Sequence, residues 1–269
     1  MPYQYVKRAE SIKAKSALLS KVLIILVCLS RSGGLQASTE ILNNTGEEKE
    51  SLLVGENHLS VQVEFGGETQ YITEGRDQLD DGGIIWGEMV MEYASIHLYS
   101  SLGQASRQNY REWQLGISYD VFETETFDGI IGLQFVEIYG DERESDAEFA
   151  SAVAYRGIGW VTVSIDHTYS LQSNGHFIEL SLHGKSVELA GKGLVTPYVS
   201  QAFDFQFANE EYNGANHVQF GIEARYPLSQ KLSLSGHMSH VIPQGGIKRD
   251  VSFEAKQQTF AGVSISLQF

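Results

Sequence analysis

The chain ends with the stretch Ala261-Gly262-Val263-Ser264-Ile265-Ser266-Leu267-Gln268-Phe269, in which apolar residues alternate with small or polar ones. Successive side chains of a β-strand point to opposite faces, so the pattern predicts a strand with one apolar and one polar face. The stretch stops on an aromatic residue of the apolar face. We interpret Phe269, Leu267 and Ile265 as the insertion signal of a transmembrane β-barrel, whose strands expose apolar side chains to lipid.

The same alternation recurs throughout residues 58–269. In one segment Val218 and Phe220 alternate with Gln219 and Gly221. An even number of antiparallel strands places both ends of the barrel chain on one side of a membrane. The sequence therefore predicts an all-β fold, an antiparallel up-and-down transmembrane β-barrel of about 12 strands. The predicted strands lie near residues 58–73, 84–93, 95–102, 110–121, 128–139, 146–155, 159–169, 175–188, 194–207, 216–226, 231–241 and 257–269.

Connection lengths and aromatic residues agree with a barrel. Short turns are predicted near residues 94, 122–127, 156–158, 189–193 and 227–230, and longer loops near 74–83, 103–109, 208–215 and 242–256. Tyrosine and tryptophan favour the membrane interface, and the strand ends beside the short turns carry Tyr93, Tyr119, Tyr155, Tyr226 and Phe269. A soluble periplasmic β-sandwich also has strands with one polar face, and it is the alternative fold.

Residues 1–37 have the order of a cleavable signal peptide. Basic residues between Lys7 and Lys21 precede the apolar run 22–29, and the small residue Ala37 marks a predicted cleavage point. A helix of that run would cover about 12 Å, whereas roughly 20 residues are needed to cross a bilayer, so a helical anchor is the weaker interpretation. Lipidation of Cys28 is a further alternative, but Val27 stands before it where a small residue is expected.

The remaining chain is acidic and lacks cysteine. Residues 38–57 are polar, acidic and without apolar period, and we expect an acidic N-terminal tether there. Removing residues 1–37 from 269 leaves 232 residues, which fold without disulfides because Cys28 is the only cysteine. The chain has 19 basic and 34 acidic residues; the leader holds six and one of these, so 13 and 33 remain and the net charge is −20. This charge excludes nucleic acid as a partner, since phosphate contacts need clustered Lys and Arg.

The phase of each strand also predicts which side chains point into the barrel. Acidic residues dominate this set, and a lumen with acidic rings favours cations over anions. The alternative is a solvated acidic face without a role in selectivity. Trp86, Trp160 and Tyr198 are expected to narrow the lumen or to stack on a ligand. The pore-lining candidates are Glu64, Glu88, Glu92, Glu112, Asp166, Glu179, Asp204, Glu223 and Arg225, to which Asp120, Glu148 and Lys256 are added.

Two chemical alternatives find little support in the sequence. A hydrolase needs a nucleophile or acid beside a histidine, but Asp166 and His167 are neighbours on a strand and point to opposite faces. Asp77, Asp80 and Asp81 could bind calcium, yet the EF-hand spacing is absent and a hydrated acidic loop is the better interpretation. We therefore expect no enzymatic activity, no cofactor and no metal site.

Three features of the sequence occur together: the leader, the stretch Tyr71-Ile72-Thr73-Glu74-Gly75-Arg76 before an acidic loop, and the Phe269 ending. With these features, residues 58–269 resemble porins of the TorF or Gcw-chp type. The family's aromatic-x-x-Arg-Gly pattern is kept in part, with Glu74 before Gly75 and Arg76 after it. Membership implies a small outer-membrane channel.

The sequence thus predicts a bacterial outer-membrane channel for passive diffusion of small solutes. Its expected partners are the lipid bilayer, lipopolysaccharide, the outer-membrane assembly machinery and small solutes. A non-conducting barrel with a structural or surface-contact role is the alternative function.

Overall fold

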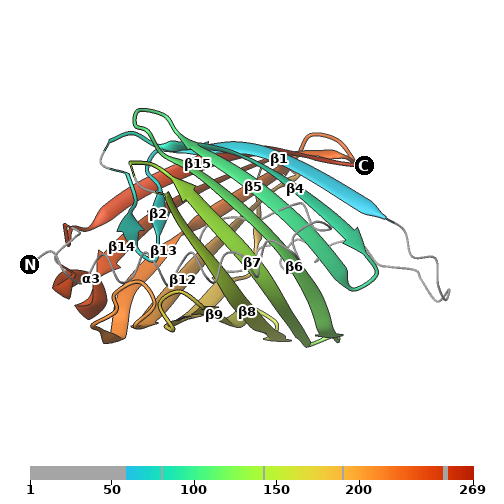
Figure 1. Ribbon diagram of the computed structural model, residues 1–269. Coiled ribbons are helices and arrows are strands. Elements are labelled where there is room, and N and C mark those ends of the chain that lie inside the picture. Colours follow the sequence, from blue (N-terminus) through green and yellow to red (C-terminus); the bar gives the residue numbers. More distant parts are fainter. Residues whose placement is uncertain (1–58, 80, 142, 190, 251–253) are drawn as a thin grey trace, which may run out of the picture.

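Twelve strands form a closed antiparallel β-barrel in the part of the chain that the structure describes (Figure 1). The structure is a computed structural model, and it describes residues 59–269 except 80, 142, 190 and 251–253. The predicted signal peptide and tether lie outside the described residues. The barrel strands are β1 Ser60–Glu68, β4 Ile84–Tyr93, β5 Ile96–Ala105, β6 Arg111–Glu123, β7 Phe127–Tyr139, β8 Arg143–Ile158, β9 Val161–Ser170, β10 His176–Gly184, β12 Gly193–Phe205, β13 Asn213–Pro227, β14 Leu232–Pro243 and β15 Gln258–Gln268.

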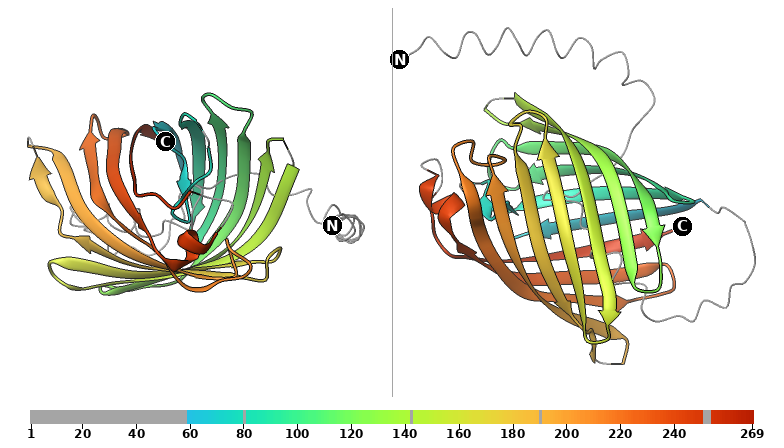
Figure 2. Two further views of the ribbon diagram at one scale, coloured as in Figure 1. Left: turned by 90° about the vertical axis from the view of Figure 1, so that its left-hand side faces the viewer. Right: turned by 90° about the horizontal axis from the view of Figure 1, so that it is seen from below.

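Each barrel strand pairs with its neighbours in chain order, and two pairings complete the ring. β1 pairs with β15, with Phe65 opposite Ile265, and β10 pairs with β12 past a short extra strand, β11 Val187–Leu189. β11 itself pairs with β12. The predicted all-β, up-and-down barrel of about 12 strands is therefore confirmed, and Figure 2 shows it from one end and from below.

The barrel wall is apolar outside and polar inside. In β15 the side chains of Val263 and Ile265 are 63% and 42% exposed, whereas Ser264 and Ser266 are buried. Burial of the polar face and exposure of the apolar face is the reverse of what a soluble protein shows, because water would penalise so large an apolar surface. The apolar exterior and the ring closure together exclude the alternative of a β-sandwich.

The two ends of the barrel differ in the length of their connections. Residues 94–95, 124–126, 159–160 and 228–231 make short turns at the end where the chain terminates. The segment between β10 and β12, which contains β11, is the exception at this end. Most connections at the other end are longer, although three residues join β7 to β8, and that end also carries α3 Gly245–Arg249 (Figure 1). This alternation was predicted from the sequence. Within the described ranges, no helix has the length and apolar character needed to cross a membrane.

The largest error in the predicted strand boundaries concerns the first strand. The first strand was expected to run to residue 73, but β1 ends at Glu68. The following residues form a small hairpin, β2 Ile72–Thr73 and β3 Arg76–Asp77, which pairs with itself and not with the barrel wall. The buried side chains of Tyr71, Thr73 and Arg76 show that this segment lies inside the barrel. We call the described residues of the range 69–83, which leave out residue 80, the inward hairpin.

Candidate functional site

A cavity of about 460 Å³ occupies the barrel interior. Each of the twelve barrel strands contributes to its lining, from Glu68 on β1 to Phe260 on β15. Arg76 is the one Lys or Arg in the lining among the described residues. The acidic lining residues are Glu68, Glu74, Glu112, Glu144, Asp146, Glu148, Asp166, Glu179 and Glu223. An interior of this composition has a negative potential.

The cavity brings together several of the residues predicted from strand phase. Glu112, Asp166, Glu179 and Glu223 line it, as does Glu148. Arg225 lines a second, smaller cavity of about 80 Å³, which Glu223 also borders. Alternation along a strand is a local property, so the sequence was sufficient to place these side chains on the inner face.

Four other candidates lie on the inner face but away from the cavity, and the predicted inward position of Lys256 was wrong because this residue precedes β15. Glu64 and Glu88 are directly opposite each other in the β1–β4 register. Glu92 and Asp120 lie near the short-turn end, where their carboxylates contact His97 at 3.6 and 2.8 Å. In a separate exposed segment, Lys256 pairs with Glu254 at 3.0 Å.

Asp204 is engaged by the protein itself and does not line the cavity. Its side chain is fully buried, and its two carboxylate oxygens accept hydrogen bonds from the backbone N–H groups of Phe207, Ala208 and Asn209. Arg76 approaches the same carboxylate at 3.6 Å. Asp204 therefore orders the loop after β12 and receives the inward hairpin.

The expected lumen position of Trp160 was wrong. The residue lies in the two-residue turn between β8 and β9, and its side chain is 71% exposed. The prediction started β9 two residues too early, so the alternation was extended into a turn. Trp86 and Tyr198 do line the cavity.

Arg76 fixes the tip of the inward hairpin to the opposite wall. Its guanidinium is 2% exposed and donates to the Asp250 carboxylate after α3 at 3.2 Å, in addition to its contact with Asp204. It also donates to Asn216 Oδ1 on β13 at 3.4 Å. A buried guanidinium requires such compensation, because desolvation of an unpaired charge is costly. The hairpin thus spans the lumen from β1 to β12 and β13.

The turn of the hairpin packs closely against that wall. Asn216 Nδ2 donates to the Glu74 carbonyl at 2.7 Å. Gly75 has φ +74°, a conformation that favours glycine, and a Cβ there would overlap the His217 ring and Ile247 of α3. The backbone conformation and the close contacts with the wall therefore both require glycine at this position.

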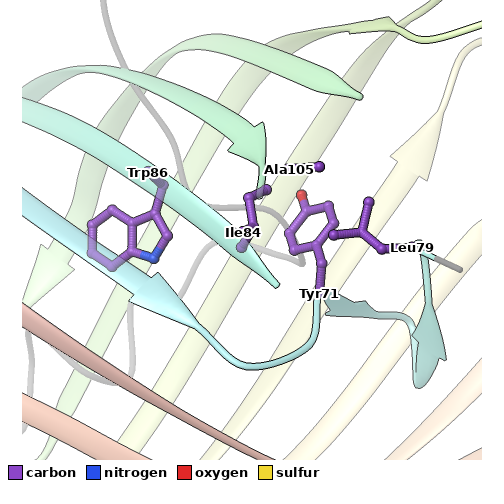
Figure 3. Packing of buried hydrophobic residues seen from close by; sticks show 5 residues of the cluster. All are labelled: Tyr71, Leu79, Ile84, Trp86 and Ala105. Carbon is purple, nitrogen blue, oxygen red and sulfur yellow. The ribbon is translucent and has the colours of Figure 1, made fainter. Parts of the chain in front are cut away.

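The base of the hairpin is held by Glu112 on β6. Tyr71 and Tyr110 both donate to Oε2 of Glu112, at 2.6 and 2.5 Å, and Gln114 donates to Oε1. Tyr71 also packs in an apolar cluster with Leu79 and Trp86 (Figure 3). These contacts attach the hairpin to the inner surface of β4 to β6.

Burial changes the protonation of groups on this hairpin and its neighbouring loop. Removal from water raises the pKa of the Glu74 and Asp77 carboxyls, although hydrogen bonds to Thr73 and to the Leu79 backbone oppose the effect. Burial and the nearby Glu112 carboxylate also raise the pKa of Tyr110. The protonated, neutral form of each group is therefore favoured inside the barrel.

Two partners of the hairpin, Glu112 and Asp204, were predicted as pore-lining candidates, but their role as anchors and the hairpin residues themselves were not predicted. Arg76 and Tyr71 entered the prediction only as part of a family resemblance. The loop was expected to be hydrated, and one part is: Asp81 is exposed and pairs with the exposed Arg107 at 3.2 Å. The one local signal for the buried part was Gly75, which marks a turn inside a segment with strand-like residues.

The geometry bears on the two chemical alternatives. Asp166 lines the cavity, whereas His167 contacts Ser151 and His176 at 3.4 and 2.9 Å, so the acid and the histidine lie on opposite faces of the wall. Within the described residues, no group of three or more His, Cys, Asp or Glu is arranged to hold a metal ion.

Comparison with known proteins gives the fold a precedent. No family model matches the sequence, and no curated protein matches it. The structure of the KdgM porin superposes with a TM-score of 0.52 at 10% identity, covering 77% of this chain and 99% of that one. The two chains share a barrel fold. A KdgM porin in complex with disordered oligogalacturonate gives a TM-score of 0.52 at 9% identity, covering 78% and 99% of the two chains. The TorF or Gcw-chp type stays a prediction.

Proposed function

We propose that the protein is an outer-membrane channel for passive diffusion of small hydrophilic solutes, with a preference for cations. The observation that carries the proposal is a closed twelve-stranded barrel with an apolar exterior and a cavity of about 460 Å³ to which every wall strand contributes. An apolar exterior suits lipid, and ring closure satisfies the backbone of every wall strand without water. The porin fold of the compared structures supports the same function.

The preference for cations rests on the charge of the cavity. Eight acidic residues besides Glu74, whose neutral form is favoured, line the described cavity, and Arg76 is already engaged by Asp204 and Asp250. Fixed negative charge around a narrow aqueous path attracts cations and repels anions. The inward hairpin narrows the path further, so small solutes are the appropriate class.

The location and partners follow from the same proposal. Residues 1–37 would export the chain as a cleaved signal peptide, and the last strand with Ile265, Leu267 and Phe269 would be read by the outer-membrane assembly machinery. The apolar wall would contact the lipid bilayer, with lipopolysaccharide in the outer leaflet. A fractionation experiment that recovers the protein in a soluble fraction would contradict this location.

The alternative is a non-conducting structural or surface-contact barrel, which the inward hairpin favours because it crosses the lumen. Conductance separates the two functions. Detergent-purified protein that shows heat-modifiable migration, a mark of a folded barrel, would be inserted into planar bilayers. We expect ohmic conductance and, in a KCl gradient, a reversal potential of the sign that potassium selectivity gives. A silent folded barrel supports the structural role, and a potential favouring chloride refutes the cation preference.

A further inference from the structure

The acidic residues of the cavity differ in how well their charges are compensated. Glu112 accepts three hydrogen bonds from side chains, and Glu148 accepts one from Gln134. Asp166 and Glu179 interact with serine hydroxyls, and Ser200 is one of the two serines that act on Glu179. Ser164 donates to Asp166 Oδ2 and Ser181 to Glu179 Oε1, each at 3.3 Å.

Asp166 and Glu179 are also direct cross-strand partners in the β9–β10 register. Like charges in this relationship repel each other, because side chains opposite one another in an antiparallel pair are close. None of the ion pairs of the described residues involves either carboxylate, and Asp166 Oδ1 is a buried oxygen without a hydrogen-bond partner there. The pair therefore lacks a counter-charge from the described part of the chain.

A second feature with an unused polar atom lies four residues further along β10, at a strand distance of about 13 Å. His183 lies on the same face of β10 as Glu179, lines the cavity and is 5% exposed. Its Nδ1 has no hydrogen-bond partner among the described residues. The ring stacks on Tyr198 of β12, with ring centroids 5.5 Å apart and planes inclined by 22°.

Tyr198 is held in place by the wall behind it. Gln219 donates to its hydroxyl at 2.6 Å, and the hydroxyl also bonds to Ser239 at 2.6 Å. The tyrosine is thereby fixed while its ring and that of His183 border the cavity. Aromatic faces attract cations and also contact apolar groups.

The carboxylate pair and the ring pair lie along the same inner face of the wall and line the same cavity. We propose that Asp166, Glu179, His183 and Tyr198 form a binding site for an organic ammonium cation. Two uncompensated carboxylates supply the charge and the acceptors for N–H groups, and the rings supply contact for the carbon body. A hard metal ion fits less well, since Ca²⁺ takes six to eight oxygen ligands and no metal-holding group of three is found among the described residues. The inference rests on the proposed channel function, whose cation preference it narrows to amines.

Block of potassium current by 1,4-diaminobutane tests the site. The full exported chain, reconstituted in planar bilayers in KCl, should show a current that falls saturably as the diamine is added. The double variant Asp166→Asn, Glu179→Gln should raise the half-blocking concentration by about tenfold or more, which corresponds to about 1.4 kcal/mol. Glu188→Gln, an equal charge change on exposed β11 outside the cavity, should leave the block as in the wild type.

Each contrary outcome has a distinct meaning. Unchanged block in the double variant, or equal block by Mg²⁺ at the same concentration, overturns the site while the channel function stands. Conductance without any block does the same. If a folded barrel does not conduct, the channel proposal fails, and calorimetric titration of the detergent-solubilised protein with the diamine still decides the site. Heat-modifiable migration verifies that each variant is folded, and Asp166→Asn alone is the second variant if the double one is not.

Discussion

The inward hairpin and the β9–β10 wall are both polar regions inside one barrel, but they are built in opposite ways. At the hairpin, each charge meets its partners: Arg76 contacts two carboxylates, and Glu112 accepts from two tyrosines. On the wall, Asp166 and Glu179 oppose each other, and serine hydroxyls donate to their carboxylates. A buried charged group whose partners are all present holds its local structure in place, whereas a buried carboxylate without a counter-charge can interact with a positively charged solute. The inward hairpin therefore fixes the shape of the lumen, whereas the β9–β10 wall offers charged groups to a solute.

The largest loss of stability at the inward hairpin is expected from Arg76→Ala. Loss of the guanidinium leaves Asp204 buried without its cation, and breaking a buried pair costs about 3–5 kcal/mol. The free energy of unfolding in urea should fall accordingly, and single-channel conductance should rise because the hairpin is released. Arg107→Ala removes an exposed pair and should cost about 0–1 kcal/mol. Equal effects of the two variants would contradict the role of Arg76.

A smaller effect is expected from Gly75→Ala. The left-handed conformation costs a Cβ-bearing residue about 1–3 kcal/mol, and overlap with His217 adds to this. Gly191→Ala is the matched control, because Gly191 has φ +79° but no atom within 4 Å of its Cβ position. The difference between the two losses of stability, measured by urea unfolding, isolates the packing of the hairpin tip. No difference would mean that the tip is not closely packed.

The wall should respond in the opposite direction. Asp166→Asn removes the repulsion with Glu179, and we expect the barrel to become more stable by about 0.2–1 kcal/mol. Urea unfolding would measure the gain. Ser164→Ala, which removes only a 3.3 Å hydrogen bond, should give no gain. A loss of stability in Asp166→Asn would show that this carboxylate is compensated after all.

The smallest expected effect is a dependence of hairpin docking on pH. Because burial raises the pKa of Glu74 above the ordinary value of 4.5, the docked hairpin binds a proton more readily than a released one. Docking is therefore strongest below about 4.5 and weakens as the pH rises through the raised pKa. Hydrogen exchange of residues 69–83, corrected for intrinsic rates, should show this trend, and Glu74→Gln should diminish it. An identical trend in the variant would assign the pH dependence to other groups.

The sequence was sufficient for the barrel and insufficient for the hairpin, for a physical reason. Strand alternation is a period of two residues, so it predicted β4 at 84–93 and the inward positions of Asp166 and Glu179 without knowledge of distant residues. Arg76 depends on Asn216 and Asp250, 140 and 174 residues away. No local pattern encodes such pairings.

The junction between β1 and β15 has a consequence for the order of folding. Gln268 donates a hydrogen bond to Ser60 there, across 208 residues of sequence. The wall therefore cannot close into a ring before nearly all of the described strands have formed. Contacts so distant in sequence form slowly, because the intervening chain must first lose its freedom. Until then the growing sheet has two open edges, which attract other strands. We expect kinetic experiments to show this seam as the last part of the barrel to gain protection, with β4 to β9 protected earlier.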